Sequence, residues 1–417
     1  MLKNTLNWHE DPLDFISIPG AISIKEQAQR KSLARNNQHF FTEESHEKRT
    51  TLARGFISEL AVRYYFKNIN SANYITPCIT SFNPKKLMFT EDKILSITAA
   101  HFFLLLYHIE KTEKKIWYAH AKKIGDLLIN RLVLQQHFFQ ERQTDLERAI
   151  YLFEDRFDFQ KGNFIPKVPY FSHFMESITQ ALDVFSDHFQ INKHCQAKIL
   201  AQLEYISTIL DQNCTYLFRD ANPNNTLIPI GSDLPKEISR TESLKTITHF
   251  FSKWAATKNK PKLFKNIVQI DFELVGLKKT NQFDDFIHII GMIPSHSLRQ
   301  NAISSFTSSL TLEKKNLFYL TWAFRMTREG ARRLRYFSEN TLDKPENYDK
   351  RYEIWGIIEE FEYMFLSSAS SLKSASKITG KTYNELIYLM QHMAFLIQKL
   401  RKQHSLSTEH HVKQRIK

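Results

Sequence analysis

The chain has 417 residues, enough for two or three domains, and its 42% apolar and 24% charged content is ordinary for a soluble globular protein. The net charge of +13 favours anionic partners such as nucleotides, nucleic acid, phospholipid surfaces or acidic proteins, although a charge that only aids solubility fits equally well. Three widely spaced cysteines argue against a disulfide framework or a zinc site. With no secretory leader and no membrane-spanning apolar run, we expect a cytoplasmic protein, in the bacterial cytosol or, if secreted, in a host cytosol.

Residues 14 to about 92 have the pattern of a small mixed region. Alternating apolar residues around a Pro-Gly break indicate two strands within residues 14–26. Apolar residues then recur at helical spacing from 52 to 64. Two β-rich stretches separated by "NPKK" within residues 74–92 indicate a hairpin. The predicted order is strand, strand, helix, strand, strand.

The remainder of the chain is mostly helical in pattern. Apolar residues recur with helical period from residue 94 to about 210, and again from about 285 to 400. Between these stretches, "YLFRDANPNNTLIPIG" and "LFKNIVQIDFELVG" carry strand and turn signals. Residues 401–417 form a basic tail. We therefore predict an α+β protein in which a β-rich part, 1–92, precedes a helical part, 93–400.

The loop "FRDANPNN" places a carboxylate, Asp220, five residues before an amide, Asn225, with a proline between them. Phosphoryl transfer from ATP needs a carboxylate that accepts or orients the acceptor hydroxyl, and an amide oxygen nearby that holds Mg²⁺. Asp271 closes the apolar strand 267–270, so its carboxylate emerges at a strand end. Asp and Asn oxygens are hard ligands of the kind that magnesium prefers.

In this order, "FRDANPNNTLI" and "VQIDFELVGL…FDDF" resemble the catalytic core of the aminoglycoside phosphotransferase and choline kinase-like families. The resemblance implies a two-lobed protein-kinase-like fold, with a small β-rich N-lobe and a large, mostly helical C-lobe. It also implies ATP- and Mg²⁺-dependent phosphorylation of a hydroxyl group on a small molecule. Carried over by position, Asp220 is the catalytic base, Asn225 and Asp271 hold magnesium, and Asp284 or Asp285 is the later structural aspartate.

The same families need a strand lysine that holds the ATP phosphates and a helix glutamate that positions this lysine. The resemblance assigns the first role to Lys25, at the end of "AISIK", and the second to Glu59 on the next helix. Glu44 and Glu47 are competing candidates that we place on the same helix. Glu91 is then expected near the adenine pocket.

The chain departs from the family pattern in three places. Phe218 and Arg219 precede Asp220 where the family usually has His and Gly, and no Gly-rich phosphate loop is present. In addition, 45 residues separate Asn225 from Asp271. Because this extra segment has helical period and eight Lys or Arg residues, we predict a basic helix at about 236–262. This helix either selects the substrate or an anionic partner, or it is an insertion without a role in function.

Three other functions fit parts of the sequence. Arg219 and the basic insertion favour a protein or lipid kinase, whereas the missing Gly-rich loop favours a pseudokinase that keeps the fold as a binding module. From another class, a basic helical nucleic-acid-binding protein would make the loop match a coincidence. Nucleic acid is the weaker choice, because the basic tail lacks the interleaved aromatic residues of a stacking surface.

Overall fold

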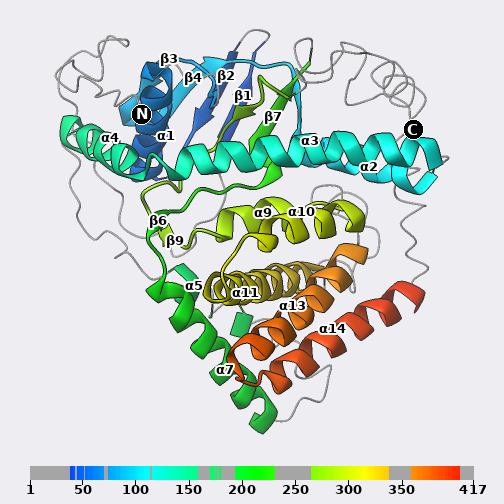
Figure 1. Ribbon diagram of the computed structural model, residues 1–417. Coiled ribbons are helices and arrows are strands. Elements are labelled where there is room, and N and C mark those ends of the chain that lie inside the picture. Colours follow the sequence, from blue (N-terminus) through cyan, green and yellow to red (C-terminus); the bar gives the residue numbers. More distant parts are fainter. Residues whose placement is uncertain are drawn as a thin grey trace.

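Helices predominate in the structure, and a small group of antiparallel strands lies at one end of the molecule (Figure 1). The predicted α+β class is confirmed. The computed structural model describes residues 38–42, 45–50, 52–69, 74–112, 115–157, 170–173, 175, 178–179, 193–230, 264–337 and 358–403. The predicted strands within 14–26, with Lys25, lie outside the described residues, as do Glu44, the predicted basic helix at 236–262 and the tail beyond 403.

The main sheet has four antiparallel strands in the order β1-β2-β4-β3. Their bounds are β1 (Gln38–Phe41), β2 (Ser45–Arg49), β3 (Ile79–Asn83) and β4 (Met88–Asp92). A short 3-10 turn, η1 (Pro84–Lys86), joins β3 to β4, which confirms the hairpin predicted around "NPKK". Helix α1 (Ala53–Asn68) follows β2 and confirms the helix predicted from the spacing between residues 52 and 64.

The segment before α1 differs from the prediction. Glu47 lies on β2 and not on the helix, because residues 45–49 pair in register with both β1 and β4. Within this strand Lys48 is buried and its neighbour Arg49 is exposed, so the two faces of a polar strand are distinguished by burial. The strand carries almost no apolar signal, since its sequence is SHEKR. Its place in the sheet is therefore set by its contacts with the rest of the protein.

Two smaller sheets join the loop segments that the sequence analysis singled out. One has the order β5-β7-β8, with β5 (Ser96–Thr98), β7 (Thr226–Pro229) and β8 (Val268–Gln269). The other pairs β6 (Tyr216–Leu217) with β9 (Lys279–Thr280). The strand signals in both predicted segments are confirmed, and the pairing brings residues 216–230 against residues 264–280.

Helices make up most of the rest of the described chain. Helices α2 and α3 cross the middle of the molecule, with the four-stranded sheet and α1 on one side and α9, α11, α13 and α14 on the other (Figure 1). The bounds are α2 (Ala99–Thr112), α3 (Lys115–Gln140), α4 (Gln143–Arg156), α5 (Tyr170–His173), α7 (Lys193–Gln212), α9 (Asp284–Gly291), α10 (His296–Ser308), α11 (Leu312–Phe337), α13 (Ile358–Thr379) and α14 (Asn384–Gln403). In the part of the chain that the structure describes, no helix combines the length and the apolar character needed to cross a membrane.

Three apolar clusters meet where these loop segments run. Leu217 and Phe272 belong to the cluster beneath the sheet, together with α1 and α4. Phe218 packs in the cluster formed by α5, α7, α11, α13 and α14. Ala221 packs in the central cluster of α2, α3, α9, α10 and α11. Successive buried side chains thus anchor the two segments in different parts of the core, and this fixes the polar residues that lie between them.

Two glycines with positive φ provide a matched test of backbone strain. Gly276 has φ +80°, and an added Cβ would lie 2.9 Å from Cδ1 of Ile150. Gly380 follows α13 with φ +72° and has open space around it. We expect Gly380→Ala to cost about 1–2 kcal/mol, from the left-handed backbone alone. Gly276→Ala is expected to cost about 1 kcal/mol more, because Ile150 must also move.

Urea unfolding of the two variants measures this difference, provided that the m-value stays at the wild-type value. Equal losses in the two variants would show that the Ile150 side chain yields without cost.

Candidate active site

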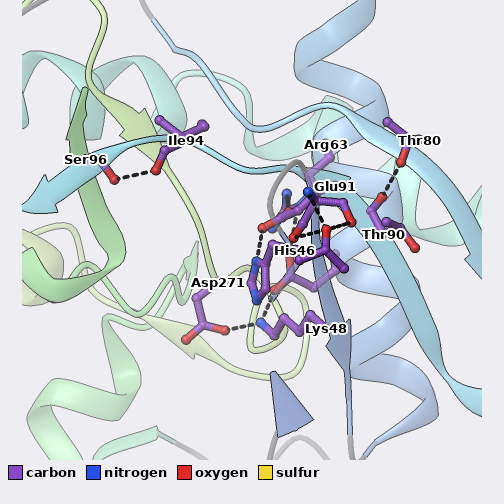
Figure 2. A network of polar contacts seen from close by, with 12 residues as sticks. His46, Lys48, Arg63, Thr80, Thr90, Glu91, Ile94, Ser96 and Asp271 are labelled. Atoms are coloured by element: carbon purple, nitrogen blue, oxygen red, sulfur yellow. Dashed lines mark hydrogen bonds and ion pairs between the residues drawn. The ribbon is translucent and has the colours of Figure 1, made fainter. Parts of the chain in front are cut away.

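A buried lysine on β2, Lys48, forms the centre of the candidate site. Its Nζ lies 2.5 Å from Oε1 of Glu59 on α1 and 2.7 Å from Oδ1 of Asp271, just beyond β8 (Figure 2). The side chains of Lys48 and Glu59 are 4% and 0% exposed, whereas that of Asp271 is 28% exposed. One ammonium group therefore joins the sheet, the helix and a distant strand end, and Asp271 is the member of the set that reaches solvent.

Opposite charges around Lys48 and Glu59 keep both side chains in their charged forms despite burial. Burial alone would lower the pKa of the Lys48 ammonium, but the carboxylates of Glu59 and Asp271 outweigh it and raise that pKa above its ordinary value. Burial alone would raise the pKa of Glu59, but the charges of Lys48 and Arg63 prevail and lower it to about 2. Lys48 and Glu59 therefore stay charged throughout the physiological pH range.

Lys48 is the candidate site residue that the sequence does not predict. The lysine paired with Glu59 was expected at Lys25, from an apolar strand pattern, whereas the structure pairs Glu59 with a lysine 11 residues before it. The segment "SHEKRTT", residues 45–51, carries a weak strand signal. Lys48 and Thr50 are two residues apart, as side chains on one face of a strand are, and the segment ends just before the helix that carries Glu59. The helical interpretation of residues 45–49 is wrong, because they form β2.

Glu91 belongs to a buried polar network next to Glu59. It is 4% exposed on β4, with Oε1 at 2.7 Å from Nδ1 of His46, and its other oxygen accepts a hydrogen bond from Arg63 (Figure 2). The register of β2 and β4 sets Glu91 opposite His46. Arg63 in turn donates to Glu59 at 2.9 Å. Glu91 is thus a link in a buried ion-pair network that supports Glu59, and its expected place near the adenine pocket stays a prediction.

The structure brings the loop that carries Asp220 and Asn225 next to the strand end that carries Asp271. Nδ2 of Asn225 donates to the backbone oxygen of Asp220 at 2.9 Å and closes the loop between β6 and β7. The backbone oxygen of Asn225 accepts from the amide of Ile270 at 3.0 Å, next to Asp271. A short 3-10 turn, η2 (Pro223–Asn225), completes the loop. One hydrogen bond therefore closes the loop between β6 and β7, called the proline loop below, and another connects it to the strand end, although the two segments are distant in sequence.

Asp271 has an unusual backbone. Its φ of +67° lies in the left-handed region, which costs residues other than glycine about 1–2 kcal/mol and which Asp and Asn tolerate best. The next residue holds this conformation, since the amide of Phe272 donates to Oε1 of Glu59 at 3.0 Å and its ring is fully buried. Strain of this kind gathers at functional sites, where the surroundings impose it.

Arg219 links the proline loop to neighbouring segments through buried hydrogen bonds. It is 2% exposed, and its Nη1 donates to the hydroxyl of Tyr74 at 2.6 Å and to Oε1 of Gln269 at 3.0 Å. Gln269 also donates to Oε1 of Gln135 on α3 at 2.6 Å. The arginine before Asp220 thus links the loop to β8 and, through Tyr74, to the chain that follows α1.

Both candidate structural aspartates are buried in the first turn of α9. Oδ1 of Asp284 lies 3.5 Å from Nη1 of Arg325 on α11. Asp285 accepts a hydrogen bond from Gln136 on α3, and burial raises the pKa of its carboxyl to about 8. The two carboxylates therefore join α9 to the helices on either side of it.

Asn225 and Asp271 are the residues that could hold a metal ion. Among the described residues, no group of three or more His, Cys, Asp and Glu side chains is arranged to hold one. One amide oxygen and one carboxylate suit Mg²⁺ better than a transition metal, because Mg²⁺ keeps several waters and takes further oxygens from phosphate groups. The donor set therefore fits the magnesium that the sequence predicts.

Comparisons of the chain with protein-family models, with curated proteins and with solved structures found no match. The assignment of the site depends on its geometry.

Proposed function

We propose that this protein is an ATP- and Mg²⁺-dependent phosphotransferase, built on a two-lobed protein-kinase-like fold, whose acceptor is a hydroxyl group of a small molecule. The observation that carries the proposal is the contact of Lys48 with both Glu59 and Asp271, beside the loop of Asp220 and Asn225. Kinase chemistry requires a strand lysine paired with a helix glutamate, a carboxylate and an amide for the metal, and a carboxylate for the acceptor.

Each residue of the set has a role in this chemistry. Lys48 binds phosphate oxygens of ATP, and Glu59 holds the lysine in place. Asn225 and Asp271 hold magnesium, which when bound offsets negative charge on the β- and γ-phosphates. Asp220 orients the acceptor hydroxyl and accepts its proton. The role that the sequence analysis assigned to Lys25 is thereby transferred to Lys48.

A small-molecule acceptor is supported over a protein by the surroundings of Arg219. This arginine was the residue in the catalytic loop that favoured a protein or lipid kinase. Its guanidinium donates hydrogen bonds to Tyr74 and Gln269, and Arg219 is 2% exposed. An active enzyme is supported over a pseudokinase because the five polar residues to which the chemistry assigns a role are all present. They are Lys48, Glu59, Asp220, Asn225 and Asp271.

The test is the loss of turnover in Asp220→Asn. With ATP, Mg²⁺ and pools of candidate hydroxyl acceptors, we expect ADP release to fall about 10²- to 10⁴-fold, because the acceptor loses its general base. The rise in melting temperature caused by Mg-ATP should remain, since the nucleotide is held by other residues. Asp155→Asn, an exposed aspartate on α4, is the matched control and should behave as wild type.

Two outcomes would contradict the proposal in different ways. A melting temperature raised by Mg-ATP in a wild-type protein that releases no ADP with any acceptor would indicate a pseudokinase. A melting temperature that ATP does not change, with or without Mg²⁺, would leave the nucleic-acid-binding alternative.

A further inference from the structure

A histidine that the sequence analysis did not single out contacts the proposed catalytic base. His288 lies on α9, and Nδ1 of its ring is 3.3 Å from Oδ1 of Asp220. The two side chains are 6% and 12% exposed. All eight residues of α9 are buried, so the ring nitrogens of His288 must be satisfied largely by other protein groups. Oδ1 of the Asp220 carboxylate lies within ion-pair distance of one of these nitrogens, outside the geometry of a hydrogen bond.

The proline loop by itself fixes only part of Asp220. The hydrogen bond from Asn225 reaches the backbone oxygen of Asp220 and not its carboxylate. A carboxylate on a fixed backbone can still rotate about its two side-chain torsions. Reactive groups work efficiently only when they are held to within roughly 0.5 Å of the productive geometry. A contact at one carboxylate oxygen supplies the restraint that the loop bond does not.

α9 is a firm support for such a contact. Ile287 and Ile290 are fully buried in the central cluster, on either side of His288 in the sequence. At the start of the helix, the amide of Phe283 donates to Oδ1 of Asn281 at 3.0 Å, and Asp284 is bound to Arg325. The histidine is therefore carried by a helix that is held in the core on several sides.

Arg325 also interacts electrostatically with Asp220. Burial lowers the pKa of its guanidinium, while the carboxylates of Asp284, Glu329 and Asp220 raise it. Nη1 of Arg325 is bound to the hydroxyl of Tyr170 and lies 3.5 Å from Asp284. Arg325 therefore contributes positive charge to this region, whereas His288 makes the contact at 3.3 Å with the carboxylate.

We propose that His288 is a positioning residue, which holds the Asp220 carboxylate in the orientation that receives the acceptor hydroxyl. The inference rests on the proposed phosphotransferase function. It adds a residue outside both the proline loop and the strand end, on a helix that faces the catalytic base from the core.

The experiment measures ADP release from Mg-ATP with water in place of the acceptor, so that it does not depend on the identity of the acceptor. We expect His288→Leu to lower kcat roughly 10- to 100-fold, as misplacement of a reactive group does, and to leave the KM for ATP within about twofold of wild type. His194→Leu, the same change at an exposed position of α7, is the matched control.

Two further comparisons separate positioning from a general effect on folding. His288→Asn puts an amide nitrogen near the place of Nδ1 and should recover most of kcat, whereas His288→Gln carries its amide one methylene further and should not. This pair decides the question even if His288→Leu does not fold. The double variant with Asp220→Asn should lose no more than Asp220→Asn alone, because the histidine acts through that carboxylate.

The inference is overturned if His288→Leu has wild-type kcat, if Gln serves as well as Asn, or if the losses multiply in the double variant. The proposed function has a separate failure. A wild-type protein whose ADP release does not depend on Asp220 overturns that function, and the role of His288 with it.

Discussion

Lys48→Met is expected to abolish Mg-ATP binding and to lower the free energy of unfolding by about 3–5 kcal/mol, the usual cost of removing one partner of a buried ion pair. Methionine fills most of the volume of the lysine stem but leaves Glu59, which is fully buried, with Arg63 as its remaining cation in the network. The rise in melting temperature with Mg-ATP should disappear. Urea unfolding and thermal shift with and without Mg-ATP measure the two effects.

A double variant separates the lysine's structural role from its functional role. Lys48→Met combined with Glu59→Leu removes both charges, so much of the lost stability should return, because a buried pair can often be replaced by apolar residues at little cost. Mg-ATP binding should not return. Lys85→Met, at an exposed position in η1, is the control for the loss of one positive charge. Wild-type nucleotide binding in Lys48→Met would refute the site.

Asp271→Ala is expected to abolish the dependence of nucleotide binding on magnesium. Because this carboxylate is the proposed principal metal ligand, its loss should weaken Mg-ATP binding by at least about 2 kcal/mol, roughly 30-fold in Kd. Binding of ATP measured in EDTA should change far less. Isothermal titration with ATP, with Mg²⁺ or with EDTA, gives both constants.

Asp271→Asn is the companion variant, because Asn tolerates the left-handed backbone at φ +67° better than Ala does. It isolates the loss of charge from the added strain. If both variants bind Mg-ATP as tightly as wild type, Asp271 is not a metal ligand and the proposed magnesium site is wrong.

The parts of the fold that carry a strong local pattern were predictable from the sequence. The helical spacing from residue 52 to 64 predicted α1, and the turn signal "NPKK" predicted the hairpin of β3 and β4. Glycine- and proline-poor apolar runs likewise predicted the helical part. In each case short-range periodicity and turn chemistry agree with the final fold, so local reasoning was sufficient.

The candidate site was predictable only where its residues share a motif. Asp220 and Asn225 sit in one loop, and Asp271 ends a recognisable strand, so their order and context identified them. Lys48 has no such context, because its strand is polar and its two partners lie 11 and 223 residues away. The register of β2 against β4, and not the local sequence, likewise decides that Glu91 lies opposite His46.

The buried network also constrains how this protein can change over evolutionary time. From His46 through Glu91, Arg63, Glu59 and Lys48 to Asp271, each group is held by a neighbour of opposite charge or by a hydrogen bond. A substitution at one of the inner positions leaves a buried charge without its counterpart. These positions should therefore covary: relatives of this chain should keep the series intact, or exchange adjoining members together for a neutral pair.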